Sequence, residues 1–193
     1  MGAHPGYPDR GNFGRVELGL SALEIERLVA EQVGVVRRAA PPAFIKPHGA
    51  LYHRCESDPE AAAAVAKVAG ECGAGVVGQP GFALLEAARA AGLPAWREGY
   101  ADRGYLPDGR LVPRGAAGDL LEPEAAADQA LRLARSGEVD VICLHGDSPG
   151  SVDVARAVRE RLVAAGVILK ALDGSIADSR YDRDDARGGP EGS

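Results

Sequence analysis

Short apolar runs alternate with longer stretches of helical periodicity along most of this chain. Strands are expected at the short apolar runs, which cover residues 44–46, 75–78, 94–98 and 139–144. Helices are expected where apolar positions recur every three or four residues; these begin at residues 21 and 58 and cover 81–91, 122–136 and 148–165. Such regular alternation is typical of βα units around a parallel sheet or barrel.

Local signals mark several of these boundaries. Ser21 and Glu24 form a capping-box pattern at the start of the first long helix. Pro59 stands in the first turn of the second, where its missing N–H costs nothing. Residues 100–104 are expected to form a loop, and the Pro-Asp-Gly turn at 107–109 can join two short extended pieces.

Length and composition indicate one globular domain. The chain has 193 residues, of which 46% are hydrophobic and 26% charged. From residue 173 onward Asp, Arg, Gly and Ser predominate and apolar residues become rare. We therefore expect a folded domain over 1–172 and a disordered tail over 173–193.

Charge and cysteine content narrow the class of protein. The net charge is −6 and the pI is near 5.3, whereas nucleic acids and anionic membranes bind basic surfaces. No apolar run approaches the length of a membrane span, and no signal peptide opens the chain. Cys55, Cys72 and Cys143 are odd in number and form no C-x-x-C pair. We therefore expect reduced thiols, a cytoplasmic location, and neither nucleic-acid nor membrane partners.

Three of the four histidines stand in short motifs rich in Gly and Pro. His4 lies in Ala-His-Pro-Gly-Tyr-Pro-Asp, His48 in Lys-Pro-His-Gly and His145 in Leu-His-Gly-Asp. The last two follow predicted strands. Because α/β folds place their chemistry at the carboxyl ends of parallel strands, we expect the imidazoles to gather at one edge of the sheet.

The motif at His145 can be interpreted in two ways. A strand ends there and a helix is expected to begin with Ser148 as its cap, so the free N–H groups could hold an anion. His145 and Asp147 are two positions apart and could share one side of an extended segment. The simpler interpretation is a capped helix start with a surface Asp and a hydrogen-bonded His, and the pattern leaves both open.

The other polar motifs are weaker alone. Lys46 beside His48 places a cation at a strand end, although a solvated Lys and a turn His are the simpler interpretation. A rigid first motif would present His4, Tyr7 and Asp9. Asp102 and Arg103 are either a carboxylate-binding pair or a surface ion pair. His53 stands outside these motifs and is expected at the surface; the common placement of the others at strand ends favours a site.

Five ordered blocks resemble the LamB/YcsF family, to which the A subunit of bacterial ATP-dependent 5-oxoprolinase belongs. They are Gly-Ala-His-Pro-Gly-Tyr-Pro-Asp at 2–9, Phe-Gly-Arg at 13–15, Lys-Pro-His-Gly-Ala-Leu-Tyr at 46–52, Ala-Asp-Arg-Gly-Tyr at 101–105 and Cys-Leu-His-Gly-Asp-Ser-Pro-Gly at 143–150. The resemblance runs from residue 2 to about residue 167.

The resemblance implies an α/β fold, a (β/α) barrel of the glycoside hydrolase/deacetylase type. It also implies ATP-dependent opening of the lactam of 5-oxoproline to L-glutamate, together with separate B and C subunits and with ATP, carried with Mg²⁺, as the co-substrate. Two family blocks that normally precede the first one are absent here. We therefore expect an incomplete barrel lacking about two N-terminal strands, and no activity from this chain alone.

The family's site residues carry over onto the motifs of this chain. The catalytic residues expected are His4, Asp9, Lys46, His48, His145 and Asp147. The substrate-binding residues expected are Tyr7, Arg15, Asp102, Arg103 and Ser148. No residue is assigned to a metal.

The expected mechanism begins with phosphorylation of the lactam oxygen. Lys46 and the helix start at Ser148 would then stabilise negative charge. His145, oriented by Asp147, would act as base. His4 and His48 could assist proton transfer, and Arg103 would bind the substrate carboxylate.

Two alternatives stay open at the level of sequence. One is a deacetylase-like metal-dependent hydrolase that uses His4, His48, His145 and Asp147 as ligands, although no local spacing supports a metal site. The other is a non-catalytic subunit whose cleft binds the substrate while its partners act.

Overall fold

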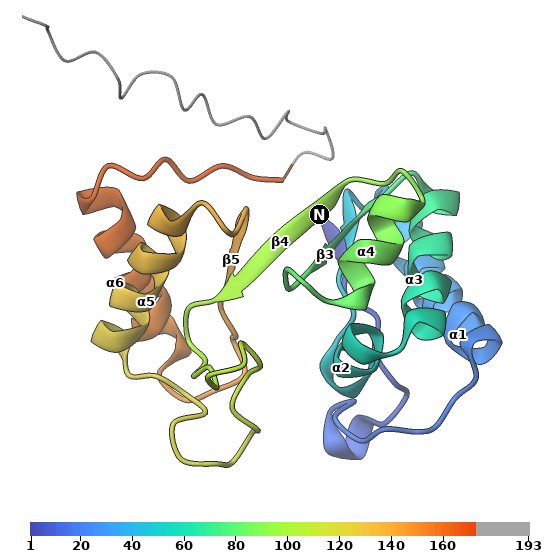
Figure 1. The fold of residues 1–193 in the computed structure, drawn as a ribbon, viewed down its shortest axis with the longest axis horizontal. Coiled ribbons are helices and arrows are strands. Elements are labelled where there is room, and N and C mark those ends of the chain that lie inside the picture. Colours follow the sequence, from blue (N-terminus) through green and yellow to red (C-terminus); the bar gives the residue numbers. More distant parts are fainter. Residues whose placement is uncertain (173–193) are drawn as a thin grey trace, which may run out of the picture.

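The computed structural model describes residues 1–172, which form a curled half-barrel of five parallel strands (Figure 1). The strands are β1 (Gly2–Ala3), β2 (Phe44–Ile45), β3 (Gly75–Gly78), β4 (Ala95–Tyr100) and β5 (Val141–Cys143). Their order in the sheet is their order in the chain, β1-β2-β3-β4-β5, and every neighbouring pair is parallel. A parallel sheet whose strands follow the order of the chain curls in the same way as the wall of a (β/α) barrel.

Within residues 1–172, seven helical segments connect and cover the strands. They are the 3₁₀ helix η1 (Arg10–Asn12) and the α-helices α1 (Ala22–Arg37), α2 (Gly49–Ser57), α3 (Pro59–Cys72), α4 (Ala83–Ala90), α5 (Pro123–Ser136) and α6 (Ser151–Ala164). In Figure 1, α1 to α4 lie on the right and α5 and α6 on the left, with β4 running between the two groups. Each group has its own apolar core.

Local chemistry explains why the helices begin where they do. Both hydrogen bonds of the capping box between Ser21 and Glu24 are present at the start of α1, as predicted. Asp58 caps α3 by accepting from two backbone N–H groups, and Pro59 occupies its first turn. α3 ends at Gly73, which adopts the left-handed conformation.

The predicted elements are confirmed in type, although several differ in their bounds and one helix was missed. β4 continues to Tyr100, so the predicted loop begins one residue later. The helix α2 was missed, because the Pro-His-Gly sequence before it indicates a turn. α6 begins at Ser151 rather than at Ser148, because Gly150 is the N-cap in the left-handed conformation, with φ of 79°.

Between β4 and α5 the chain forms an irregular loop on the side of the sheet that carries the strand ends. Tyr105 pairs with Leu111 in an isolated antiparallel bridge around the predicted turn at 107–109. Across this turn the backbone N–H of Leu106 donates to the carbonyl of Arg110 at 2.7 Å. The two extended pieces expected on either side of the turn are therefore short and confined to this loop.

Two further expectations concern membrane-spanning helices and the C-terminal residues. Within residues 1–172, no helix is both long and apolar enough to cross a bilayer. The tail predicted over 173–193 lies outside the described residues.

Candidate functional site

The strand ends open into one large cleft between the two helical groups. Its volume is about 1750 Å³, and residues that follow β1, β2, β4 and β5 line it. Nine of the predicted site residues lie there: His4, Tyr7, Asp9, Arg15, Lys46, His48, Arg103, His145 and Asp147. Asp102 is buried behind the wall, and Ser148 is not part of the lining. The shared edge of parallel strands thus brings the motifs together.

Asp102 and His145 form a dyad at the ends of β4 and β5. Nδ1 of His145 lies 3.0 and 3.1 Å from the two carboxylate oxygens of Asp102. The backbone N–H of His145 also donates to Asp102, at 2.8 Å. Because a carboxylate only accepts, Nδ1 carries a hydrogen, and in the neutral imidazole Nε2 then has the lone pair.

The surroundings of the dyad hold both groups in place. Asp102 is buried, which would raise its pKa, but the hydrogen bonds from His145 outweigh this effect and lower the pKa. The ring of Tyr100 stacks on the imidazole, with centroids 5.5 Å apart and planes 13° from parallel. Within residues 1–172, Nε2 of His145 has no hydrogen-bond partner. This nitrogen is therefore available to a ligand in the cleft.

Asp102, rather than Asp147, orients His145, so the expected His145–Asp147 pairing is wrong. β4 and β5 are neighbours in register, and Ala101 N–H donates to the carbonyl of Cys143 at 3.0 Å. This pairing places Asp102 beside His145. Asp147 instead faces arginines: its carboxylate binds Arg15, and a second oxygen lies 3.7 Å from Arg114.

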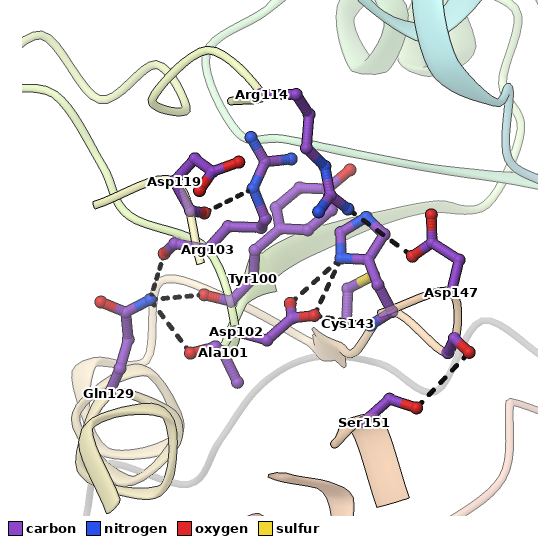
Figure 2. Close-up of polar contacts among 12 residues, drawn as sticks. Tyr100, Ala101, Asp102, Arg103, Arg114, Asp119, Gln129, Cys143, Asp147 and Ser151 are labelled. Carbon is purple, nitrogen blue, oxygen red and sulfur yellow. Dashed lines mark hydrogen bonds and ion pairs between the residues drawn. The ribbon is translucent and has the colours of Figure 1, made fainter. Parts of the chain in front are cut away.

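Gln129 of α5 fixes the backbone that carries Asp102, and the sequence pattern did not single it out. Its side-chain amide donates to the carbonyls of Tyr100, Ala101 and Arg103 at 2.8, 3.3 and 2.7 Å (Figure 2). A polar residue on the inward face of an otherwise alanine-lined helix is the only sequence signal for this role.

Lys46 packs against the sheet with only 15% of its side chain exposed, rather than being solvated, which corrects the simpler interpretation of its motif. Its Nζ binds Glu98, lies 3.0 Å from Sγ of Cys143 and sits 4.8 Å from the centre of the Tyr100 ring. Burial would lower the pKa of Lys46, but Cys143 and Glu98 together raise it, so the amine stays charged.

Glu98 is the buried partner that sequence reasoning missed. It is 1% exposed, and the hydroxyl of Tyr100 donates to its other oxygen at 3.3 Å. Glu98 and Tyr100 are two residues apart in β4 and so point to the same face of the strand. A carboxylate on an inward strand position was the available signal.

His4 and His48 form a second imidazole pair. Nε2 of His4 lies 3.0 Å from Nδ1 of His48. The outer nitrogens face backbone carbonyl oxygens, that of His4 at 2.7 Å from Lys46 and that of His48 at 2.8 Å from Phe13. Carbonyls only accept, so both outer nitrogens carry hydrogens. A hydrogen bond between the inner nitrogens then requires one extra proton on the pair.

The surroundings of His4 disfavour a proton on that ring. His4 is exposed at the cleft, yet desolvation by the protein beside it is the main cause that lowers its pKa to about 4. An extra proton on the pair therefore belongs to His48, which then donates through both nitrogens while neutral His4 accepts through Nε2.

Two further predicted residues use polar atoms in structural contacts, although the second carboxylate oxygen of Asp9 is buried without a hydrogen-bond partner among the described residues. The hydroxyl of Tyr7 donates to Glu17 at 2.8 Å. One oxygen of Asp9 caps η1 by accepting from the backbone and side chain of Asn12. Both residues therefore shape the loop that lines the cleft, and their expected parts in substrate binding and catalysis stay predictions.

Arg103 is neither a surface residue nor paired with Asp102. Its Nε and one Nη donate to the backbone carbonyls of Asp119 and Val112 at 2.8 and 2.6 Å. Burial lowers the pKa of this guanidinium. Arg103 has only one terminal nitrogen left for a ligand, which argues against the two-pronged grip on a carboxylate that the sequence suggested.

The four residues of the metal-site alternative do not converge. His4 pairs with His48, His145 with Asp102, and Asp147 with arginines. Within the described residues 1–172, no group of three or more His, Cys, Asp or Glu is arranged to hold a metal ion.

Known proteins are similar to this chain in both sequence and fold. The model of the LamB/YcsF family matches residues 1–177. A protein of Methylococcus capsulatus, named as the A subunit of 5-oxoprolinase, is 42% identical over 197 residues, which cover 92% of this chain and 76% of that one. A protein of the same name from Thermus thermophilus is 40% identical, covering 89% and 77%.

A solved structure agrees with these relatives. The crystal structure of a lactam utilization protein from Thermus thermophilus superposes with a TM-score of 0.79 at 38% identity, covering 88% of this chain and 76% of that one. The family resemblance drawn from the five sequence blocks is thereby confirmed. This chain belongs to the LamB/YcsF family.

Proposed function

We propose that this protein acts as the A subunit of an ATP-dependent 5-oxoprolinase, which opens the lactam of 5-oxo-L-proline to L-glutamate. The names of its relatives support this assignment. The observation that carries it is the Asp102–His145 dyad, whose Nε2 is free at the wall of the cleft formed by residues 1–172.

The dyad suits hydrolysis of an activated amide. ATP supplies the activation, since a phosphorylated lactam oxygen makes the ring carbon a better electrophile for water. Nε2 of His145 takes the proton of the attacking water, and Asp102 stabilises the imidazolium that forms. The carbon–nitrogen bond then breaks, and the imidazolium returns the proton to the departing nitrogen. This step leaves an acyl phosphate, and a second water hydrolyses it to phosphate and L-glutamate.

The cationic groups of the cleft suit the negative charge that develops. Lys46 stays protonated, and its Nζ lies over the ring of Tyr100, which also stacks on His145. The charge of Lys46 is therefore close to the dyad and favours a phosphoryl or oxyanion group there. The His4–His48 pair adds a second positive charge when it binds the extra proton that its hydrogen bond requires. We assign no anion to Ser148, because the helix begins three residues later.

The partners follow from the same assignment. An A subunit by name is one part of a multi-subunit enzyme, and we propose that this chain works with B and C subunits in the cytoplasm. ATP, carried with Mg²⁺, is the co-substrate of the assembled enzyme.

Glutamate release from 5-oxo-L-proline tests this function, measured with ATP and purified B and C subunits. We expect His145→Ala to lower turnover about 100-fold or more, as loss of a general base does. His53 is exposed, as expected, but it lines the cleft, so the control is Arg156→Ala, a change at an exposed residue of α6 outside the lining.

Each outcome separates the alternatives. Normal turnover by His145→Ala with intact binding of 5-oxoproline would give the chain a binding role only. Absence of 5-oxoproline binding by the unaltered chain would overturn the proposed function. Full glutamate release by these 193 residues with B and C supplied would contradict the expectation that this chain alone is inactive.

A further inference from the structure

We infer that Arg15 and Arg114 form a clamp for a small oxyanion, and that the carboxylate of Asp147 occupies this clamp as an internal stand-in. The clamp itself is argued from geometry. Its assignment to the carboxylate of 5-oxoproline rests on the proposed function, and the alternative source of the same chemistry is a phosphoryl group.

Two distant segments bring their guanidinium groups to one carboxylate. Arg15 follows η1, whereas Arg114 lies in the loop between β4 and α5. One oxygen of Asp147 binds Arg15. The other lies 3.7 Å from Arg114 (Figure 2). Both arginines favour the ionised carboxylate and lower the pKa of Asp147 against the opposing effect of its burial. The arrangement is one that a ligand carboxylate could reproduce.

A ligand anion can replace the carboxylate of Asp147 between the two arginines, whereas the contacts of Arg103 are fixed. The side chains of Arg15, Arg114 and Asp147 are 39%, 25% and 26% exposed, and all three line the open cleft. Exposed ion pairs of this kind contribute little to folding stability. An incoming anion can therefore replace Asp147 without unfolding its surroundings, whereas Arg103 is held by two backbone carbonyls.

The position of the clamp fits the dyad. Asp147 is two residues beyond His145 in the same loop, so an anion in its place lies on the same side of the cleft as the free Nε2. The described lining also favours anions: five arginines face three carboxylates, although the whole chain has a net charge of −6. The arginines are Arg10, Arg15, Arg103, Arg110 and Arg114, and the carboxylates are Asp9, Glu56 and Asp147.

Calorimetric titration with three ligands tests the clamp on the full chain. The ligands are 5-oxo-L-proline, 2-pyrrolidinone, which is the same lactam without the carboxylate, and inorganic phosphate. We expect Arg114→Gln to weaken binding of 5-oxoproline about 10-fold and to leave 2-pyrrolidinone unchanged. We expect Asp147→Asn to strengthen binding of 5-oxoproline several-fold, because the internal competitor loses its charge.

Controls separate the clamp from general effects of charge and folding. Arg156→Gln removes an exposed arginine of α6 that pairs with Asp153 and lies outside the cleft lining, so no change is expected. Thermal melting checks that each variant is folded. Should Arg114→Gln fail to fold, Arg114→Lys keeps the charge but loses the planar guanidinium, and should still weaken anion binding.

The outcomes distinguish this inference from the proposed function. Unchanged affinity in Arg114→Gln together with weaker binding in Asp147→Asn would overturn the clamp, even if the enzyme releases glutamate normally. Changes in phosphate binding alone would support a phosphoryl clamp and overturn its assignment to the substrate carboxylate. Absence of glutamate release with an intact clamp response would count against the proposed substrate only.

Discussion

Nδ1 of His48 lies 3.0 Å from Nε2 of His4, and each ring directs its outer nitrogen at a backbone carbonyl. Two neutral imidazoles in this arrangement would point lone pairs at each other. A hydrogen bond between the two rings in this geometry therefore requires one extra proton. The hydrogen bond from Nε2 of His48 also holds the carbonyl of Phe13. Phe13 has a φ of 58° and is the one non-glycine residue of the described chain with a positive φ.

We predict that nitrogen-15 NMR of histidine-labelled protein at pH 7 will find both nitrogens of His48 protonated and only one nitrogen of His4. The reason is the donor and acceptor count of the pair. A His4→Leu variant, which offers no acceptor, should leave a hydrogen on only one nitrogen of His48. Spectra of the unaltered protein with one proton on each ring would contradict the shared proton.

The lowered pKa of His4 predicts a pH dependence of folding stability. Its pKa falls from 6.5 to about 4 in the folded chain, so the unfolded chain binds more protons between these values. The free energy of unfolding should therefore decrease as the pH falls from 6.5 towards 4. Urea denaturation at several pH values measures this, and His4→Asn should flatten the dependence. An equally steep dependence in His4→Asn would assign the effect to other groups.

Asp102→Asn should lower turnover by about 10⁴-fold while leaving the protein folded. An amide at this position can donate to Nδ1 of His145, which then places the hydrogen on Nε2 and removes the base from the cleft. Steady-state kinetics of glutamate release measures the effect. Asp153→Asn, an exposed change on α6, serves as control. A loss of less than 10-fold would show that Asp102 does not set the tautomer.

Loss of one partner of the Lys46–Glu98 pair should lower the free energy of unfolding more than replacement of both partners. Glu98→Gln strands the ammonium of Lys46 and should cost about 3 kcal/mol of unfolding free energy. Lys46→Met combined with Glu98→Leu should cost less than either change alone, because no buried charge is left unpaired. Urea denaturation of these variants checks this. Additive losses would contradict direct coupling of the pair.

Gly49 predicts a backbone-specific effect next to His48. Its φ is 58°, and a Cβ there would overlap the carbonyl oxygen of Gly14. Gly49→Ala should therefore destabilise the fold by about 1 kcal/mol or more. Gly34→Ala is the matched control: a Cβ at this position of α1 meets no atom within 4 Å. It should be neutral or stabilising, since alanine favours helices. Equal effects of both changes in thermal melts would refute the argument.

The sequence by itself determined the type and order of most elements and the edge at which the chemistry gathers. Apolar periodicity and caps are local signals, so the strand at 75–78 and the capping box at Ser21 could be predicted directly. The meeting of His4, Lys46, His48 and His145 in one cleft follows from a general rule, because parallel strands end at the same edge.

Only the tertiary structure decided which side chains pair within that cleft. His145 is two residues from Asp147 in sequence, yet the register of β4 against β5 places Asp102 beside it. Lys46 meets Glu98 across 52 positions of sequence, and Arg114 meets Asp147 through a loop without regular structure. Hydrogen bonds depend on distance and direction to within fractions of an ångström, and spacing along the chain carries no such information across separate strands.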